Sequence, residues 1–285
     1  MLVQFGHVAW LHPYLLGNPW IVGSFTKGET STQAMISLSQ NELERSHKDS
    51  MSENSAMTFL GRLSLNKAAK PDQINDREIV THAFGNISAG SDTTAIAMRS
   101  VMYNILNDRK AYNRLTSDVR KNLSLPVSFS SANELPYLRA AIQEGMRLHP
   151  SVGQILSRSA PEGGALVGDY KLKANVQVGM SPWVLHRDPD VFPEPDCFKP
   201  ERWIIEEGHS DEDALRRMNR SFFAFGHGTH TCSGKHISIM ETTKLVATLL
   251  LKYDLELAEG VGPLTFVNRW FTQQEGLIVN VRHRK

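Results

Sequence analysis

The stretch F-A-F-G-H-G-T-H-T-C-S-G-K-H, from Phe223 to His236, decides the fold of this chain. It contains three glycines, Gly226, Gly228 and Gly234. Glycine adopts backbone conformations that other residues avoid, so the stretch predicts a tight loop. Cys232 stands just before a helix that the apolar spacing predicts over about 235–253. The amides and the positive end of that helix would face the sulfur and favour a thiolate.

Two other interpretations of this stretch remain open. Histidine and cysteine are zinc ligands, and the stretch holds His227, His230, Cys232 and His236. Their spacing, H-x-x-H-x-C-x-x-x-H, matches none of the common structural zinc patterns. The second alternative is that Cys232 is an inert, buried residue.

A long helix is predicted upstream, over 75–106, where Asn75 and Glu78 have the spacing of a capping box. Its middle reads A-G-S-D-T-T, Ala89 to Thr94. Glycine costs about 1 kcal/mol in a helix relative to alanine, and Ser, Asp and Thr compete for the backbone. Such weakness inside a consistent element points to a functional site. The alternative is a close helix crossing at Gly90, with hydroxyl groups bonded back to carbonyls.

A third motif lies on a helix predicted over 136–148 and ended by Pro150. Glu144 and Arg147 are three residues apart and share a face of this helix. The later run F-K-P-E-R-W, residues 198–203, offers Arg202 as a second partner for the same carboxylate. By itself, a pair with this spacing is typical of a solvated surface bridge worth under about 1 kcal/mol.

Composition restricts the class of protein. The 285 residues are enough for one large domain or two small ones, and a net charge of +1 gives no broad footprint for nucleic acid. The cysteines, Cys197 and Cys232, are too few for a disulfide-stapled scaffold and fit a reducing compartment. The apolar opening over 1–25 is broken by glycine and proline, so it does not predict a membrane span. It is either packed in the core or dips into a membrane surface.

The remaining pattern is helical first and then strand-like. Helices are predicted over 30–46, 57–65 and 109–123, with a surface loop at N-K-A-A-K-P-D, 66–72. Short strands punctuated by glycine follow over 152–182, then a proline-rich segment of little regular structure over 186–221. Two strands near 264–271 and 276–282 close the chain. This order predicts a mainly helical α+β fold.

The three motifs, in this order, resemble the C-terminal part of the cytochrome P-450 family of heme-thiolate monooxygenases. The ending N-R-W-F-T-Q-Q-E-G-L is similar to fungal members of the pisatin demethylase type. The resemblance implies one truncated domain of that fold over 1–285, with the oxygen-binding helix over 75–106 and the heme-thiolate loop over 223–236. The membrane anchor, the first helices and strands, and the W-x-x-x-R helix of the family would precede this part. W-x-x-x-R at Trp183–Arg187 lies in the wrong order to be that motif.

The resemblance also implies a role for each motif residue. Cys232 would be the axial ligand of heme iron, and a thiolate ligand favours O–O cleavage. Ala89 and Gly90 would leave room for dioxygen, while Thr93 and Asp92 would deliver protons. Phe225 would shield the sulfur, and the three loop glycines, Gly226, Gly228 and Gly234, would shape the turn under the heme.

Further residues are implied around the cofactor. Arg158 and His230 would bind the heme propionates, although the family usually has arginine at the position of His230, and Ser233 replaces a usual apolar residue. Glu144, Arg147 and Arg202 would form the structural triad. The turn Arg269–Phe271 would be one surviving substrate contact.

The function implied is insertion of one oxygen atom of O2 into a small hydrophobic molecule, in fungal secondary metabolism or detoxification. Electrons would come from NADPH through a reductase. The location would be intracellular, at the endoplasmic reticulum membrane for the full-length family. The alternatives are a catalytically inactive, truncated family member and a zinc-binding structural domain. No nucleic acid partner is expected.

Overall fold

The computed structural model describes residues 31–48, 58–205, 211–260 and 262–284. The apolar opening over 1–25 lies outside these residues. Internal contacts divide the chain into two units, Met1–Asp92 and Thr93–Lys285. The boundary falls within one helix, α5 (Asp76–Asn107), and therefore does not mark a linker.

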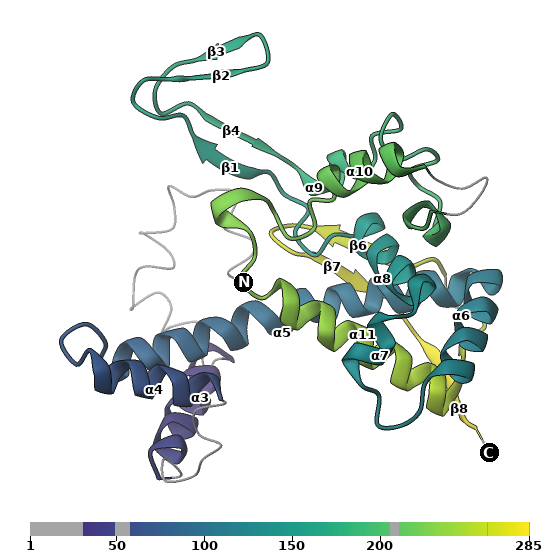
Figure 1. The fold of residues 1–285 in the computed structure, drawn as a ribbon, viewed down its shortest axis with the longest axis horizontal. Helices are drawn as coiled ribbons and strands as arrows, with labels where there is room; N and C mark the ends of the chain where they lie inside the picture. The colour runs from purple at the N-terminus through teal and green to yellow at the C-terminus, as the bar shows by residue number, and fades with distance from the viewer. Residues whose placement is uncertain (1–30, 49–57, 206–210, 261, 285) are drawn as a thin grey trace. The chain divides into compact units, whose positions relative to one another are not determined.

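Among the described residues of the first unit, α3 (Ser31–Lys48) and α4 (Phe59–Ala69) precede α5 (Figure 1). Thr58 caps α4 by accepting a 3.0 Å hydrogen bond from the Gly61 amide. Helix α4 extends through Asn66–Ala69. The prediction of a surface loop from residue 66 is therefore wrong for these four residues. The alanines at the end favour helix, and Pro71 follows the cap residue Lys70.

Helix α5 confirms the predicted long helix to within one residue at each end. The capping box is present: the Asn75 amide donates to Glu78 Oε2 at 2.8 Å, and the Glu78 amide donates to Asn75 Oδ1 at 3.1 Å. The helix continues without interruption through the weak run Ala89–Thr94.

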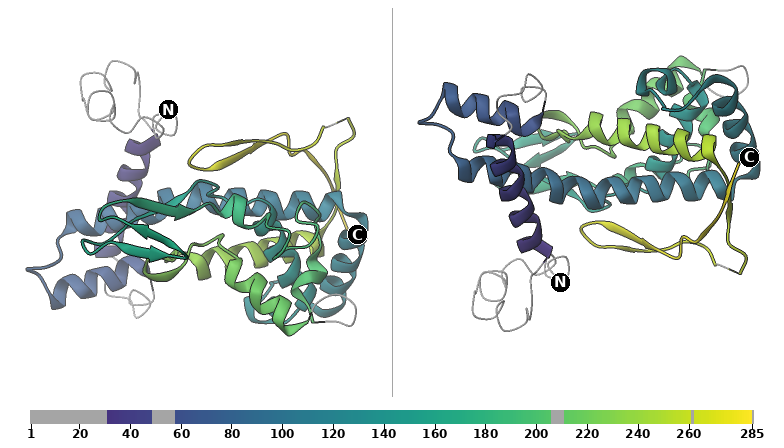
Figure 2. Two further views of the ribbon diagram at one scale, coloured as in Figure 1. Left: turned by 90° about the horizontal axis from the view of Figure 1, so that it is seen from above. Right: turned by 90° about the horizontal axis from the view of Figure 1, so that it is seen from below.

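The second unit is built on helices that follow α5. They are α6 (Arg109–Asn122), α7 (Phe129–Asn133), α8 (Pro136–Leu148), α9 (Pro182–Leu185), α10 (Glu212–Ser221) and α11 (Lys235–Lys252). Figure 2 shows α11 alongside the later part of α5 in both views. The largest cluster of buried apolar residues joins α5, α6, α8 and α11, with Val101, Leu115, Leu138 and Val246 at its centre.

Helices α5 and α8 cross closely at a glycine. A methyl group added at Gly145 would come within 2.8 Å of the Val101 Cα atom, so a larger residue does not fit. The Ser100 hydroxyl donates to the Gly145 carbonyl at 2.7 Å in the same contact. This crossing fixes the face of α8 that carries Glu144.

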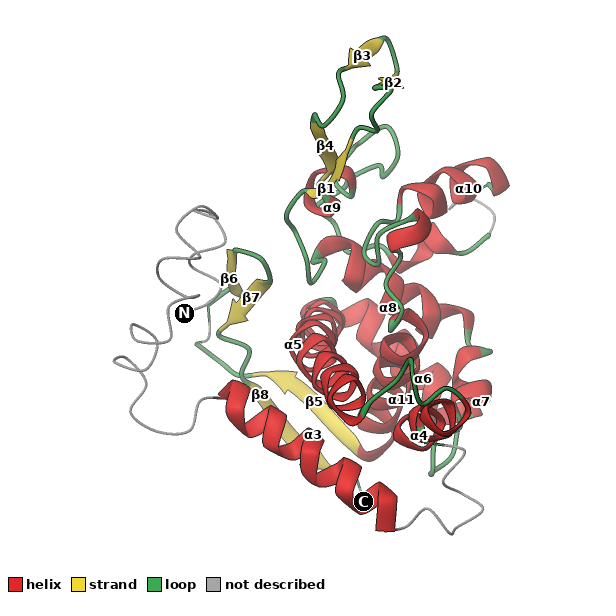
Figure 3. Cartoon of the chain, turned by 90° about the vertical axis from the view of Figure 1, so that its left-hand side faces the viewer, coloured by secondary structure: helices red, strands yellow, loops and turns green. Residues whose placement is uncertain are grey.

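In the ranges that the structure describes, the strands form four antiparallel pairs (Figure 3). They are β1 (Leu156–Ser159) with β4 (Gln177–Met180), β2 (Ala165–Val167) with β3 (Tyr170–Leu172), β5 (Tyr253–Leu257) with β8 (Val279–His283), and β6 (Thr265–Asn268) with β7 (Thr272–Glu275). The predicted mainly helical α+β class is confirmed.

Further predictions of secondary structure are wrong in detail. The segment over 186–221 contains helix α10, whose charged sequence follows an N-cap at Asp211. The strand predicted over 264–271 ends at Asn268, because residues 269–271 form the turn of the β6–β7 hairpin and β7 begins only at Thr272. In the described part of the chain, no helix is both long and apolar enough to cross a membrane.

Candidate active site

The loop that carries Cys232 is held by its own backbone. The Gly226 amide donates to the Phe223 carbonyl at 3.0 Å, and the Cys232 amide donates to the Phe225 carbonyl at 2.9 Å. Gly226 and Gly228 have φ angles of +67° and +71°, a region that favours glycine. The predicted tight loop is therefore present, and a short 3₁₀ turn, η5 (Gly228–His230), lies within it.

Cys232 is a free and exposed thiol at the end of this loop. Its carbonyl accepts a 3.3 Å hydrogen bond from the amide of Lys235, the first residue of α11. A methyl group added at Gly234 would lie 3.8 Å from Cys232 Sγ. The sulfur is thus exposed and next to a helix N-terminus, and the alternative of a buried cysteine is wrong.

The zinc alternative requires His227, His230, Cys232 and His236 to converge. Within the described ranges, no group of three or more His, Cys, Asp or Glu side chains could hold a metal ion. The four residues are all described, and they are not gathered into a zinc site.

Strand β1 meets the cysteine loop. A methyl group added at Gly226 would lie 3.7 Å from Leu156 Cδ1 and 3.5 Å from the His230 carbonyl oxygen. Arg158 is two residues after Leu156 and therefore lies on the same face of the strand. Its side chain is exposed, with one guanidinium nitrogen donating to the Ser157 carbonyl at 2.7 Å. His230 is also exposed.

The structure brings Glu144, Arg147 and Arg202 together in a buried ion-pair network. Their exposed fractions are 0%, 0% and 7%. Arg147 donates to both carboxylate oxygens of Glu144, at 2.8 and 2.9 Å, and Arg202 Nε donates to Oε1 at 3.0 Å. The alternative of a solvated surface bridge does not describe this site.

The network includes groups that the motif did not predict. Trp203 Nε1 donates to Glu144 Oε2 at 2.8 Å, and the Lys199 amide donates to Oε1 at 3.0 Å. The remaining guanidinium hydrogens of Arg147 go to main-chain carbonyls, those of His186, Pro195 and Cys197. Trp203 directly follows Arg202 in the run 198–203. This adjacency is the one signal in the sequence that could have pointed to Trp203 as a partner of Glu144.

Of the four predicted α5 residues, Thr93 alone belongs to the unit that holds Cys232, while Ala89, Gly90 and Asp92 belong to the first unit. The Thr93 carbonyl accepts a 2.7 Å hydrogen bond from the Ser151 hydroxyl. Next to it, Thr94 Oγ1 donates to Ser238 Oγ at 3.4 Å. Since Ser238 is in the first turn of α11, the Thr93 region of α5 lies against the helix that Cys232 precedes.

In the first unit, Ala89, Gly90 and Asp92 are exposed. A methyl group added at Gly90 would meet no described heavy atom of that unit within 4 Å. The structure of that unit therefore gives no close crossing at Gly90. The close crossing within the second unit is at Gly145.

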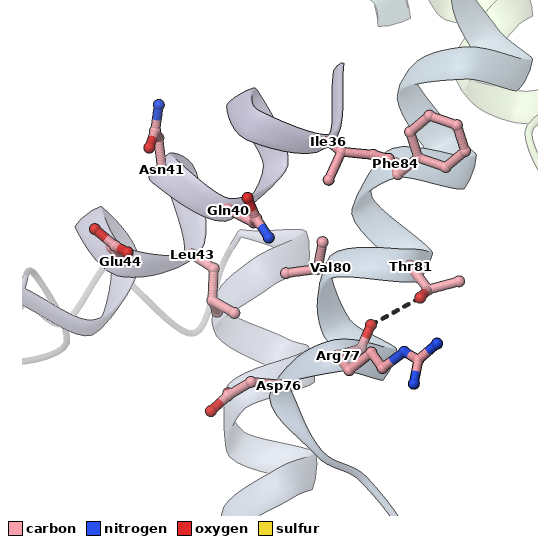
Figure 4. A pocket seen from close by; sticks show the side chains of 10 residues that line it. All are labelled: Ile36, Gln40, Asn41, Leu43, Glu44, Asp76, Arg77, Val80, Thr81 and Phe84. Atoms are coloured by element: carbon pink, nitrogen blue, oxygen red, sulfur yellow. Dashed lines mark hydrogen bonds between the residues drawn. The ribbon is translucent and has the colours of Figure 1, made fainter. Parts of the chain in front are cut away.

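A cleft of about 730 Å³ lies in the first unit, between α3 and the beginning of α5. Figure 4 shows Ile36 and Leu43 of α3 facing Val80 and Phe84 of α5. The lining contains none of the predicted site residues. This hollow is therefore not the site that the motifs indicate.

Known proteins of one family are similar to this chain. The family model "Cytochrome P450" matches residues 5–281. The chain is 35% identical over 281 residues to cytochrome P450 monooxygenase cicH of Emericella nidulans, covering 96% of this chain and 55% of that protein. It is 36% identical over 221 residues to cytochrome P450 monooxygenase pkfB of Emericella nidulans, covering 75% and 42%.

A third relative is cytochrome P450 monooxygenase mpaDE of Penicillium roqueforti, 34% identical over 291 residues that cover 98% of this chain and 33% of that protein. The chain thus spans about half or less of the length of these curated relatives. The family match extends over nearly the whole chain and includes the Cys232 loop and the Glu144 network. This chain belongs to the cytochrome P450 family.

Proposed function

We propose that this chain is the part of a heme-thiolate monooxygenase that supplies the axial ligand, Cys232, and inserts one oxygen atom of O2 into a small hydrophobic molecule. The observation that carries this proposal is the placement of a free, exposed thiol on a glycine-shaped loop at the N-terminus of α11. Fungal secondary metabolism or detoxification is the proposed setting, supported by the fungal relatives.

The residues present fit a heme. A single unpaired thiol is a suitable axial donor, and the glycine conformations keep the backbone close beneath it. Arg158 shares a strand face with Leu156, which touches the loop, and charge-assisted bonds from an arginine suit a propionate. His230 would offer a weaker, pH-sensitive donor than arginine at the second propionate position. Heme, when bound, supplies the chemistry that activates dioxygen.

Side chains of this chain would shield the sulfur ligand and deliver protons to the oxygen site. Phe225, partly buried against the core, would cover the sulfur, with Gly226, Gly228 and Gly234 leaving space beneath. Thr93 would donate a hydrogen bond to the oxygen site, with Asp92 relaying protons from solvent. Ala89 and Gly90 would leave room on that helix, since neither carries a large side chain.

Partners and location are also proposals. Electrons would arrive from NADPH through a reductase. An intracellular site at the endoplasmic reticulum membrane is expected for the family, and the described residues supply no spanning helix. The Arg269–Phe271 turn, between β6 and β7, would contact substrate.

The test uses the two free cysteines as a matched pair, because Cys197 is exposed like Cys232 but lies outside the loop. Cys232→Ser and Cys197→Ser are expressed with heme, and the ferrous carbonyl spectrum is recorded. We expect the long-wavelength Soret band of a thiolate-bound heme in the wild type and in Cys197→Ser, and its loss in Cys232→Ser. Retention of the band in Cys232→Ser would remove the ligand assignment.

Turnover is tested separately. A wild type with the band but without NADPH-dependent oxygenation of any hydrophobic substrate, in the presence of a reductase, would favour the inactive alternative.

A further inference from the structure

A buried histidine, His186, joins two of the motifs described above. Its exposed fraction is 0%, and it directly follows the short helix α9. One ring nitrogen, Nδ1, lies 2.9 Å from the carbonyl oxygen of Arg147. The other, Nε2, accepts a 2.7 Å hydrogen bond from the main-chain amide of Phe223. The ring therefore spans the distance between α8 and the first residue of the Cys232 stretch.

These partners determine the tautomer of the ring. The Phe223 amide can only donate, so Nε2 carries no hydrogen. The Arg147 carbonyl can only accept, so Nδ1 carries it. His186 is a neutral imidazole with both nitrogens used, stacked at 5.4 Å on Phe222 and edge-on to Phe192.

His186 is also held through its own main chain. Its carbonyl accepts a 2.7 Å hydrogen bond from Arg147 Nη1, the same arginine whose carbonyl accepts from the ring. Arg147 is in turn fixed by Glu144. The ring position is thus set by the ion-pair network and has little freedom of its own.

Main-chain hydrogen bonds connect Phe223 to the residue that carries the thiol. The Phe223 carbonyl accepts from the Gly226 amide, and the Phe225 carbonyl accepts from the Cys232 amide. No other hydrogen bond to the Phe223 amide is present among the described residues, and this amide is buried. Removing the imidazole would leave it unpaired and release the start of the loop.

We propose that His186 is a positioning residue for the Cys232 loop: it transfers the fixed geometry of the Glu144–Arg147 network to Phe223 and so holds the thiol where it can bind iron. This inference rests on the proposed function, because its effect is on the ligand geometry of Cys232. The hydrogen bonds of the imidazole go to the main chain of Arg147 and Phe223, so its effect on Cys232 is indirect.

The experiment separates the hydrogen bond of Nε2 from that of Nδ1. A glutamine amide reaches about as far as Nε2 and can accept from the Phe223 amide, whereas an asparagine amide reaches only about as far as Nδ1. His186→Gln, His186→Asn and His186→Leu are therefore compared in the heme-loaded protein. His149→Leu is the matched control, because His149 is also buried and hydrogen-bonded, to the Thr272 carbonyl at 3.0 Å, but does not touch the loop.

The readout is the fraction of bound heme that shows the long-wavelength ferrous carbonyl band, together with the melting temperature. We expect the ratio of thiolate-bound to other heme to fall about tenfold in His186→Leu and His186→Asn, the size expected for a buried donor left unpaired. His186→Gln should largely restore the ratio. His149→Leu should lower the melting temperature without changing the ratio.

Several results would overturn the inference. They are an unchanged ratio in both His186→Leu and His186→Asn, rescue by asparagine and not by glutamine, or an equal loss in His149→Leu. If His186→Leu does not fold, the comparison of glutamine with asparagine still decides. A wild type without the band would instead refute the proposed function, so the two failures are distinct.

Discussion

The Ser151 hydroxyl donates a 2.7 Å hydrogen bond to the main-chain carbonyl oxygen of Thr93. Ser151 lies just after α8, and its own carbonyl accepts from the Thr272 amide of β7 at 3.0 Å. One residue therefore links the middle of α5 to the β6–β7 hairpin. Because the hydroxyl bonds to a carbonyl in the weak run Ala89–Thr94, it supports the helix where its sequence is least favourable.

Ser151→Ala should reduce the free energy of unfolding by about 0.5–1.5 kcal/mol, the net value of one such hydrogen bond. Urea denaturation measures this change. Ser157→Ala is the control, because Ser157 is an exposed residue of β1, and its stability should be within about 0.5 kcal/mol of the wild type. Equal stabilities of the two variants would show that the Ser151 hydroxyl contributes nothing to this link.

Thr93→Ala should fold nearly as well as the wild type, since alanine is the better helix former. Its effect should appear in coupling, with more peroxide and less product for each NADPH consumed. The neighbouring Thr94→Ala should instead lower the stability and leave the ratio of product to NADPH unchanged, because the Thr94 side chain is buried and hydrogen-bonded to Ser238. An unaltered ratio of product to NADPH in Thr93→Ala would exclude the proton-delivery role.

Arg202→Ala should destabilise the protein by about 3–5 kcal/mol, because it removes one partner from a buried carboxylate. Domains of ordinary stability have only about 5–15 kcal/mol in total. We therefore expect poor solubility and weak heme retention. Arg216 forms exposed pairs with Glu212 and Asp213, so Arg216→Ala should change stability by at most about 1 kcal/mol. Similar melting temperatures for the two variants would contradict this account.

Acid should destabilise the fold through His186. The pKa of His186 is lowered from 6.5 to about 3, chiefly by burial and also by the charges of Arg147 and Arg187, against the opposing effect of the hydrogen bond to the Arg147 carbonyl. Because the folded-state pKa lies below the unfolded value, the stabilisation is complete above about pH 6.5 and is lost as the pH falls toward 3. Burial also lowers the pKa of His149, with the same sign.

The measurement is the free energy of unfolding between pH 7 and pH 4, compared between the wild type and His186→Gln. Each pKa unit corresponds to about 1.36 kcal/mol, so the wild type should lose a few kcal/mol that the variant does not. Parallel pH profiles for the two proteins would show that His186 does not control this loss.

The ends of helices were predicted well where neighbouring residues in the sequence determine them. The capping box at Asn75 and Glu78 sets the start of α5, and proline positions set both ends of α8. Strand β5 and helix α10 were not predicted. Strand β5 continues directly from α11, and its pairing with β8 depends on residues 279–283, which no short window contains.

The same limit applies to the site. Glu144, Arg147 and Cys232 could be named from spacing and from the family resemblance. Trp203 and His186 could not be assigned their contacts, because their partners are Glu144, Arg147 and Phe223, which lie 37 to 59 positions away in the sequence. Buried polar contacts of this kind are determined by the tertiary fold.

The five donors of Arg147 give the irregular segment between His186 and Cys197 a fixed length. Arginine has five N–H groups, and in Arg147 three of its bonds go to carbonyls spread along that segment. Surface loops ordinarily tolerate inserted or deleted residues. Here a change of one residue would shift a carbonyl away from a guanidinium that no water reaches. This loop is thus expected to accept side-chain variation at its exposed positions while tolerating neither insertion nor deletion.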